Sequence, residues 1–385
     1  MNINLLTKDS KREKTAMLDH GLITICFMLT GLGLVMVYSA SSHKAISMGS
    51  PFFFLYRHMI FLFIGFVSAA VILQIPSKLW QLLAKWLVVF GMVLLIIVLF
   101  PGIGKKVNGA QRWLAFAGFS FQPSELMKLF VILYTADFAA RKSTYLGDFK
   151  KGFLPMLITL GLTGSFLLLE PDLGACIVIS TVAIGILFLG GLSYKFLTSL
   201  VFTSGCVFSL LIIFEPWRFQ RVISFMNPLD FLFGSGYQLS HSLFAFARGD
   251  WFGVGLGRSM EKLFYLPEAH NDFILAVIGE ELGLAGVWIT IGLFISLIVK
   301  GFMIGTKAAV LERGFASLVA YGISLWIALQ SLISMAVNLG LSPTKGLTLP
   351  FVSFGGSALL VNFIALGILL RIDWENRLMM RGAVS

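Results

Sequence analysis

The stretch LPEAHNDFILAVIGEELG, from Leu266 to Gly283, joins a polar turn to an apolar segment that carries two adjacent glutamates. Pro267 breaks the segment that precedes it. Asn271 and Asp272 are residue types that cap a helix, because a short side chain can accept a hydrogen bond from an otherwise unpaired N–H group. The residues that follow predict a helix apolar enough to enter a membrane. Charges beside such a helix are costly unless they are paired or used in chemistry.

The composition of the whole chain is that of a membrane protein. Its 385 residues are 57% hydrophobic and only 12% charged, with a mean hydropathy of +0.90, whereas a soluble domain needs more polar surface. The formal net charge of +10 fits an excess of Lys and Arg in inner loops. Nothing in the sequence is typical of a basic module with interleaved aromatic residues, so we expect no nucleic-acid partner. The three cysteines lie in apolar runs and predict no disulfide framework.

Ten apolar segments along the chain have the length of a membrane span, which is about 20 residues. They lie near residues 21–40, 57–75, 80–100, 124–140, 153–169, 173–190, 196–214, 273–298, 315–340 and 352–370. The sequence therefore predicts an all-α polytopic membrane protein. We expect a ten-span domain over 21–370, a large outer loop over 215–272 between the seventh and eighth spans, and terminal tails over 1–20 and 371–385.

The distribution of charges predicts the orientation of these spans. Lys and Arg are densest in the short segments on the same side as the N-terminal tail, which places both termini in the cytoplasm. No convincing cleavage site follows the first apolar run, so we expect that run to be retained. Most acidic residues at helix mouths then fall near the outer face, and any chemistry is expected there.

Asp272 is the first candidate for that chemistry. It could cap the following helix, or it could accept a proton from a substrate hydroxyl beside His270 and Glu268, and the two roles are compatible. Partial burial would raise the pKa of Asp272 from about 3.9. Glu280 and Glu281 lie two to three turns deeper. We expect structural roles for them, one paired inside the bundle and the other near the helix ends.

A second candidate site is the stretch FQPSELMKLF at 121–130. Ser124 is placed to cap a helix, and Glu125 and Lys128 are three residues apart on one face of that helix. Two ionisable groups in an apolar span must avoid lipid. We therefore expect the Glu125–Lys128 face to point into an outer cavity.

Two loops add further candidates. The hairpin LEPDLG contains Glu170 and Asp172, which turn chemistry alone could explain. The stretch NLGLSPTKGLTLPFVSFGGS at 338–357 places Lys345 in a loop bounded by Pro and Gly, where a lone cation suits a phosphate. No strand precedes its Gly-Gly pair, so this is not a nucleotide-binding fingerprint.

The outer segment 215–272 is too aromatic for a disordered linker and predicts amphipathic helices and Gly-rich turns at the membrane interface. Its cations could contact anionic head groups, or a pyrophosphate. These cations are Arg218, Arg221, Arg248, Arg258 and Lys262.

Taken together, QPSELMKL, EPDLG, FGSGYQLSHSLFAFARGDWFGVGLG, KLFYLPEAHNDFILAVIGEELG and SPTKGLTLPFVSFGGS resemble the SEDS family (shape, elongation, division and sporulation) of polytopic peptidoglycan polymerases. The resemblance covers nearly the whole chain, from about Gly21 to Arg371. LPEAH and SPTKG resemble the cell-division branch of the family more than its elongation branch. The family implies ten spans with both termini in the cytoplasm.

The resemblance implies a reaction at the outer face of the cytoplasmic membrane. The family polymerises lipid II, a disaccharide-pentapeptide on undecaprenyl pyrophosphate, into glycan strands, in this branch at the division septum. A sugar hydroxyl attacks the anomeric carbon of the lipid-linked chain, which needs a base for the hydroxyl and positive charge for the leaving group. Position by position, the resemblance implies one catalytic base and a set of substrate-binding residues. The base is Asp272, and the others are Glu125, Lys128, Asp172, Lys345, Arg218 and His270.

Other interpretations of the sequence stay open. A lipid II flippase would also need a cationic outer cavity, but it predicts ionisable groups deep in the bundle and at the inner face. A non-catalytic scaffold of the division complex predicts that Asp272 is dispensable. The resemblance implies a class B penicillin-binding protein and other division proteins as partners. Carboxylates beside a pyrophosphate could hold Mg²⁺ or Mn²⁺, but no ligand spacing in the sequence is diagnostic of a metal site.

Overall fold

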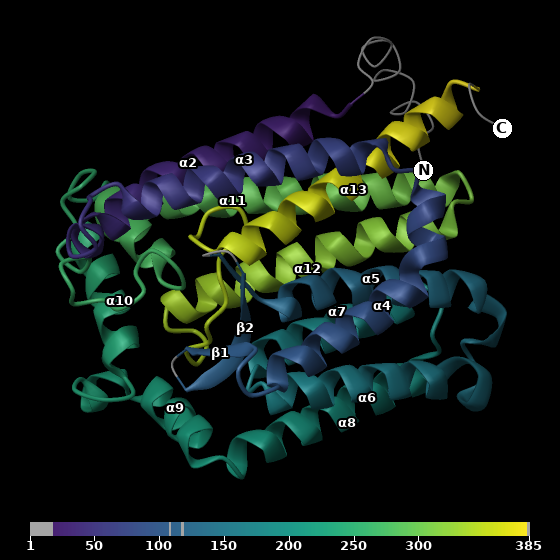
Figure 1. Ribbon diagram of the computed structural model, residues 1–385, viewed down its shortest axis with the longest axis horizontal. Coiled ribbons are helices and arrows are strands. Elements are labelled where there is room, and N and C mark those ends of the chain that lie inside the picture. The colour runs from purple at the N-terminus through teal and green to yellow at the C-terminus, as the bar shows by residue number, and fades with distance from the viewer. Residues whose placement is uncertain (1–17, 108, 117–118, 383–385) are drawn as a thin grey trace.

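The protein is described here by a computed structural model, which covers residues 18–107, 109–116 and 119–382. Long helices lie side by side in a bundle, and shorter helices and loops gather at one end of it (Figure 1). The first turn of the first described helix and the last turns of the final helix lie together at the opposite end, where Arg377 is 3.6 Å from Asp19. Most of the predicted N-terminal tail lies outside the described residues.

Ten long helices lie at the ten predicted positions. They are α2 (His20–Ile46), α3 (Phe53–Gln74), α4 (Ser77–Leu99), α5 (Pro123–Arg141), α6 (Leu154–Leu169), α7 (Leu173–Leu189), α8 (Tyr194–Ile213), α11 (Ile274–Val310), α12 (Gly314–Asn338) and α13 (Gly356–Met380). This confirms the predicted all-α polytopic fold. Within the described residues, eight helices are long and apolar enough to cross a membrane. The helix α7 is shorter, and α5 contains four charged residues, so the count of ten crossings stays a prediction.

Two of the helices extend beyond the ends expected from hydropathy. The helix α11 continues to Val310 rather than ending near 298, and α13 continues to Met380 through most of the segment expected to be a tail. Polar side chains at these ends are satisfied by ion pairs: Lys300 lies 3.1 Å from Asp19, and Arg377 lies 2.7 Å from Asp373. Hydropathy underestimates such ends because it counts charges and not their partners.

A small sheet was not predicted from the sequence. Between α4 and α5, the strands β1 (Gly104–Val107), β2 (Ala110–Phe116) and β3 (Phe119–Phe121) form an antiparallel sheet in the order β1-β2-β3. Its strands are short, and β1 (GKKV) has little of the β-branched and aromatic enrichment that normally predicts a strand. Its consequence for the site is that β2 extends toward the hairpin between α6 and α7, where it places Arg112.

The large outer loop folds into short helices, as expected. It contains α9 (Pro216–Met226), the 3₁₀ turn η3 (Pro228–Phe231) and α10 (Tyr237–Gly249), and these lie at the end of the bundle away from Asp19 and Arg377 (Figure 1). On the cytoplasmic side assigned from the sequence, two further turns, η1 (Ser143–Tyr145) and η2 (Phe149–Phe153), connect α5 to α6.

The loop between α12 and α13 is buried although it is not helical. Leu347, Leu349, Phe351 and Val352 are all buried. A side chain at Gly33 of α2 would clash with this loop, since a Cβ there would lie 2.7 Å from the carbonyl oxygen of Val352. Irregular backbone at such depth is tolerated where protein covers it. This covered loop, 339–355, forms one wall of the site described below.

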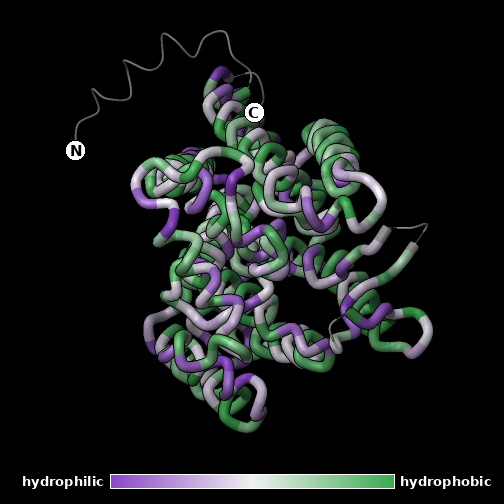
Figure 2. The backbone as a smooth tube through the Cα atoms, turned by 90° about the vertical axis from the view of Figure 1, so that its left-hand side faces the viewer, coloured by the Kyte–Doolittle hydropathy of each residue, from purple (hydrophilic) through white to green (hydrophobic). Residues whose placement is uncertain are grey.

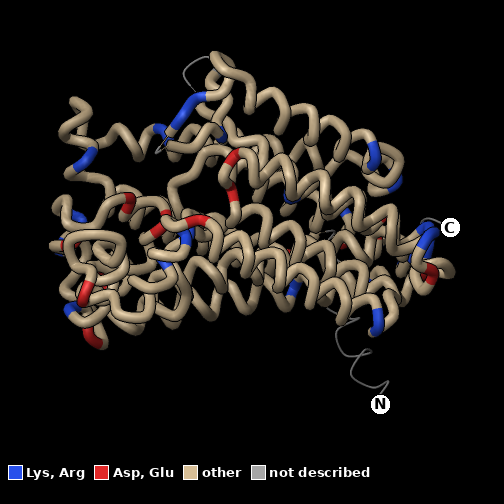
Figure 3. The backbone as a smooth tube through the Cα atoms, turned by 90° about the horizontal axis from the view of Figure 1, so that it is seen from below, with Lys and Arg blue, Asp and Glu red and all other residues tan. Residues whose placement is uncertain are grey.

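Charged residues gather mainly toward the two ends of the bundle (Figure 3). Figure 2 views the bundle from the end that carries the outer loop, where hydrophilic stretches lie in the loops; eight of the described helices are apolar enough to cross a membrane. This pattern is the one expected of helices that cross a lipid bilayer.

Candidate active site

A cavity of about 350 Å³ opens at the end of the bundle that carries the outer loop. The hairpin between α6 and α7, the helix α9 and the loop 339–355 all contribute to its walls. Apolar residues such as Ile177, Ile333 and Trp217 line part of it. Its charged lining consists of four cations and one acid, namely Arg112, Arg218, Arg221, Lys345 and Asp172. Such a cavity suits an anionic group attached to an apolar chain.

The four cations come from three parts of the chain: the strand β2, the helix α9 and the loop 339–355. Arg112 on β2 donates a 2.8 Å hydrogen bond from Nε to the carbonyl oxygen of Glu170, and a second bond to that of Pro171. Arg218 is buried on α9 and donates to the carbonyl oxygen of Leu211 at 3.1 Å. Burial and the neighbouring arginines lower the pKa of Lys345. Mutual repulsion of this kind is relieved when an anion binds.

Asp172 both caps a helix and lines the cavity. Its Oδ1 accepts a hydrogen bond from the N–H group of Ala175 at 3.1 Å, at the start of α7. Its Oδ2 accepts bonds of 3.1 Å from Ser124 and from Gln122. Ser124 therefore does not cap α5, as the sequence had predicted; Gln122 occupies that position, and the Ser124 hydroxyl joins α5 to the hairpin instead.

Neighbouring Glu170 is buried at the end of α6. Burial, and secondarily the charge of Asp172, raise the pKa of Glu170 to about 8. Among the described residues, neither carboxylate oxygen of Glu170 has a hydrogen-bond partner. Glu170 is therefore largely protonated at neutral pH, so it adds little negative charge to the cationic cavity beside it.

The carboxylate of Asp272 lies against the wall of this cavity. A Cβ atom on Gly346, which lines the cavity, would be 3.3 Å from Oδ2 of Asp272. Burial and the charge of Glu268 raise the pKa of Asp272 to about 7, while the charge of Arg221 opposes this shift. Within the described residues, no hydrogen bond goes to this carboxylate. Asp272 is therefore a desolvated carboxylate with a pKa suited to accept a proton near neutral pH.

The predicted cap of α11 is wrong. The helix begins at Ile274 and its N-cap position is Phe273, so neither Asn271 nor Asp272 caps it. Asn271 instead donates to Glu268 at 2.5 Å. The sequence could not exclude a cap at Asp272. The side chain that bonds the start of α11 comes instead from Asn338, on α12.

His270 lies on the other side of Asp272, among aromatic rings. It is buried, with its ring centroid 4.6 Å from that of Phe54 and 5.7 Å from that of Phe354. Burial lowers the pKa of His270 to about 4, so it is neutral at physiological pH. It is not among the residues lining the cavity in the described part of the chain. Its predicted contact with substrate therefore stays a prediction.

Glu125 and Lys128 form the ion pair that their spacing suggested, with 2.9 Å between Oε1 and Nζ. The pair is buried, and Lys128 also donates to Gln330 of α12 at 2.9 Å. Gln330 in turn donates to the carbonyl oxygen of Thr348 in the loop 339–355 at 3.0 Å. Neither member of the pair is among the described residues that line the cavity. That this face points into an outer cavity stays a prediction; through Gln330 the pair is connected to the loop 339–355.

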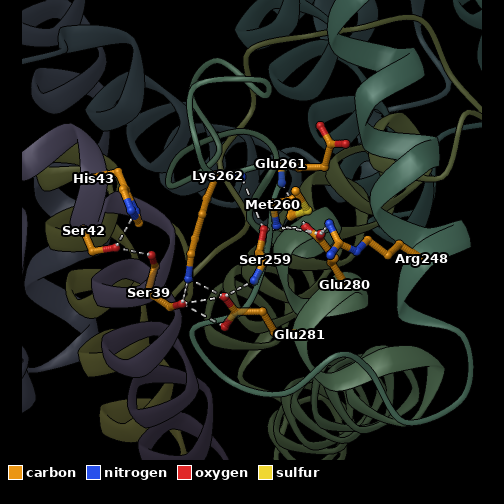
Figure 4. Close-up of polar contacts among 10 residues, drawn as sticks. All are labelled: Ser39, Ser42, His43, Arg248, Ser259, Met260, Glu261, Lys262, Glu280 and Glu281. Carbon is orange, nitrogen blue, oxygen red and sulfur yellow. Dashed lines mark hydrogen bonds and ion pairs between the residues drawn. The ribbon is translucent and has the colours of Figure 1, made fainter.

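The two adjacent glutamates of α11 anchor the loop that leads to Asp272 (Figure 4). Glu281 is 2.8 Å from Nζ of buried Lys262 and accepts a 2.7 Å bond from Ser39 of α2. Glu280 accepts bonds from the hydroxyl of Ser259 and, at 2.8 Å, from the N–H group of Met260. Both glutamates are fully buried. These contacts agree with the structural roles expected for them, and both glutamates lie in the last turn before the non-helical Gly283 that interrupts α11.

This anchoring also changes the interpretation of two outer-loop cations. Lys262 is paired with Glu281, and Arg248 lies 3.5 Å from Glu280. These two cations therefore do not face the cavity, whereas Arg218 and Arg221 do.

Three residues of the site carried no clear signal in the sequence. Arg112 lies in the unpredicted sheet, and Gln330 and Asn338 are single polar residues in an apolar helix. A buried amide in an apolar helix is the one signal that could have suggested a role, since its polar atoms need partners. The sequence does not say which partners these are.

The residues described here form no cluster of three or more His, Cys, Asp or Glu side chains that could hold a metal ion. At the cavity, cations outnumber acids, which fits an anionic ligand better than a dedicated metal cage. A requirement for Mg²⁺ or Mn²⁺ stays an untested expectation.

Comparison with known proteins identifies the family. The model of the cell cycle proteins FtsW, RodA and SpoVE matches residues 20–378. The chain belongs to this family. It is the SEDS family that the sequence motifs resemble.

Relatives in the family are similar over nearly the full chain. A protein of Aromatoleum aromaticum is 52% identical over 97% of this chain and 91% of its own length, and one of Burkholderia thailandensis is 50% identical over 96% and 82%. Both carry the name "Probable peptidoglycan glycosyltransferase FtsW".

Solved structures share the fold. The crystal structure of RodA from Thermus thermophilus covers 92% of this chain and 96% of its own, with a TM-score of 0.66 and 25% identity. A chain from a structure described as "Structural coordination of polymerization and crosslinking by a peptidoglycan synthase complex" covers 93% of this chain and 98% of its own, with a TM-score of 0.77 and 24% identity.

Proposed function

We propose that this protein is a peptidoglycan glycosyltransferase that polymerises lipid II into glycan strands during cell division. The observation that carries the proposal is the position of Asp272, whose buried carboxylate lies against a cavity lined by four cations. The names of the family members about 50% identical to it agree with this activity. The active site faces outward, with both termini in the cytoplasm and the protein in the cytoplasmic membrane at the septum.

The reaction follows from the geometry in two parts. The sugar hydroxyl of the acceptor attacks the anomeric carbon of the lipid-linked glycan, and Asp272 accepts the hydroxyl proton as the new glycosidic bond forms. The bond from the anomeric carbon to the pyrophosphate breaks, and undecaprenyl pyrophosphate leaves with the electron pair. Lys345, Arg112, Arg218 and Arg221 stabilise the charge on that leaving group. The apolar wall of the cavity accommodates the start of the lipid chain.

A flippase that moves lipid II across the membrane is the second candidate. It needs a route for the pyrophosphate to the inner face. In the described residues, ionisable groups do lie at the inner end of the bundle, as a flippase predicts, but they are paired with one another, including Lys300 with Asp19 and Arg371 with Glu375 at 2.7 Å. The cationic lining lies at the outer end. This arrangement favours polymerisation at one face.

We further propose a transpeptidase partner of the class B penicillin-binding type, together with other division proteins. One structural relative comes from a peptidoglycan synthase complex in which polymerisation and crosslinking are coordinated. That description supports a partner of this kind for the present chain, although the residues of contact are not assigned.

Polymerisation of lipid II by the purified protein with its partner tests the proposal, comparing the wild type with Asp272→Asn. Asparagine keeps the size of the side chain but cannot accept the proton, so we expect the rate to fall at least about a hundredfold. Because Asp272 does not cap α11, thermal stability should be unchanged.

Asp250→Asn is the matched control. Asp250 is an exposed residue in the same outer loop, and asparagine keeps the size of its side chain. Its rate should equal that of the wild type. A folded Asp272→Asn protein that still makes glycan strands at near the normal rate would contradict the enzyme proposal and favour the flippase or the scaffold.

A further inference from the structure

The start of α11 has an unusual arrangement of hydrogen bonds. A helix N-terminus leaves several N–H groups without partners in the helix, and the residue at the N-cap usually satisfies one of them with its side chain. Phe273 occupies that position in α11 and has no acceptor. Asp272, one residue earlier, is of the right chemical type but does not bond the helix. Another residue must therefore complete this end of the helix.

The side-chain amide of Asn338, at the end of α12, completes it. Its Nδ2 donates to the carbonyl oxygen of Asp272 at 2.8 Å, and its Oδ1 accepts from the N–H group of Ala276 at 3.1 Å. These two backbone groups are four residues apart, so they are the pair that would bond to each other if the helix began one residue earlier. The amide of Asn338 lies between them and bonds both; the N–H group of Ala276 shares its hydrogen between Asn338 and the carbonyl oxygen of Phe273, also at 3.1 Å.

Asn338 is itself held in this orientation. Its Nδ2 also donates to the carbonyl oxygen of Ser334 at 2.8 Å. The hydroxyl of Ser242 on α10 bonds only the backbone carbonyl of Asn338, at 2.7 Å, and does not orient the amide. The residue is fully buried. Two carbonyl oxygens near Nδ2 and one N–H group near Oδ1 fit only one orientation of the amide. A buried group with every polar atom bonded is rigid.

The loop 339–355 holds the same short segment from the other side. The hydroxyl of Ser353 donates to the carbonyl oxygen of Asn271 at 2.6 Å. The N–H group of Phe354 donates to the carbonyl oxygen of His270 at 3.0 Å. The backbone around Asp272 is thus fixed at three successive carbonyl groups. Of these three, only the bond from Asn338 acts on the peptide of Asp272 itself.

We propose that Asn338 is a positioning residue for the reaction: by bridging the carbonyl of Asp272 and the N–H group of Ala276, it prevents Asp272 from capping its own helix and leaves the carboxylate free to face the cavity. This inference rests on the proposed function, in which that carboxylate is the general base. The charged groups that face Asp272 are Glu268 from its own loop and Arg221 from α9.

The variant Asn338→Ala removes the bridge. The N–H group of Ala276 can then bond the carbonyl of Asp272 directly, the helix gains a residue, and Asp272 becomes its N-cap. A carboxylate that accepts N–H bonds at a helix start has a lowered pKa, and it turns away from the substrate. We expect kcat to fall at least about tenfold with KM nearly unchanged, and the acidic limb of the rate–pH profile to move down by roughly one pH unit.

Asn338→Asp is the second variant, of almost the same shape. It keeps an acceptor for Ala276, so Asp272 is not recruited as a cap, but the ionised side chain cannot donate to the carbonyl of Asp272. We expect kcat to fall as in Asn338→Ala, but the acidic limb not to move to lower pH. Ser242→Ala is the control, because it removes a bond to the backbone of Asn338 and leaves both bonds of the amide. Its kcat and pH profile should match the wild type.

The outcomes separate this inference from the proposed function. If Asp272→Asn is inactive while Asn338→Ala keeps the wild-type kcat and pH profile, the positioning role is wrong and the general base stands. If Asp272→Asn is active, the proposed function itself fails. If Asn338→Ala does not fold, Asn338→Asp decides, and a wild-type kcat in that variant overturns the inference. An equal downward shift of the acidic limb in both Asn338 variants would also overturn it, because the cap would then not be the cause.

Discussion

Removing one partner of the Glu125–Lys128 ion pair should destabilise the protein more than removing both. The two side chains are 10% and 1% exposed and their charged atoms are 2.9 Å apart. In Lys128→Met, Glu125 would remain as a buried charge without its cation, since its Oε2 already lacks a partner among the described residues. An uncompensated buried charge costs about 3–5 kcal/mol. The double variant Glu125→Gln/Lys128→Met leaves no charge, and we expect it to lie within about 1–2 kcal/mol of the wild type.

Thermal unfolding of the purified protein in detergent measures this difference. The loss in Lys128→Met corresponds to a fall in the apparent melting temperature on the order of 5–10 °C, and the double variant should recover most of it. Lys44→Met is the control: its ion pair with Glu268 has side chains 37% and 36% exposed, and pairs of that kind contribute at most about 1 kcal/mol. Single variants as stable as the wild type would refute the argument. A double variant that recovers stability but not polymerisation would show that the charges also serve the reaction.

Two further predictions concern the cavity. Asp272 must lose its proton to act as a base, and burial raises its pKa to about 7. The polymerisation rate should therefore rise with pH through about 7 and be roughly tenfold lower at pH 6 than on the plateau. A flat profile between pH 5.5 and 8 would contradict this. Lys345→Met removes one of the cations that line the cavity, so the half-saturating lipid II concentration should rise about tenfold or more. The control is Lys106→Met, at an exposed position on β1, which should leave that concentration unchanged. Equal values for the two variants would show that Lys345 does not bind the substrate.

The fold could be predicted from the sequence largely because eight of the described helices contain an apolar stretch long enough to cross a membrane. Hydropathy locates such helices, and the ten long helices lie where it placed them. It placed the ends less well: α11 and α13 continue through Lys300 and Arg377 because these cations have acidic partners across the inner end of the bundle. The sheet before α5 was missed because its strands are short and carry no alternation of apolar and polar residues.

The candidate site was predictable in its residue types and not in its contacts. Asp172 and Lys345 do line one cavity, and Asp272 lies against it. The caps expected at Ser124 and Asp272 were wrong because each helix begins at another residue: the N-cap is Gln122 in α5 and Phe273 in α11. Ser124 bonds Asp172 across 48 residues. The role of His270 in binding substrate stays a prediction.

The two glutamates of the opening stretch show why local chemistry could not decide between structure and catalysis. Both are charged and buried at membrane depth, which by itself suggests function. Glu281 is satisfied by Ser39, which is 242 residues away, and Glu280 by the turn at Ser259. Asp272, eight residues before Glu280, is bonded by Asn338 only at its peptide carbonyl, and no described residue donates a hydrogen bond to its carboxylate. The difference between an anchor and a base on one short stretch is therefore whether a distant residue supplies the carboxylate with hydrogen bonds, and only the fold determines that.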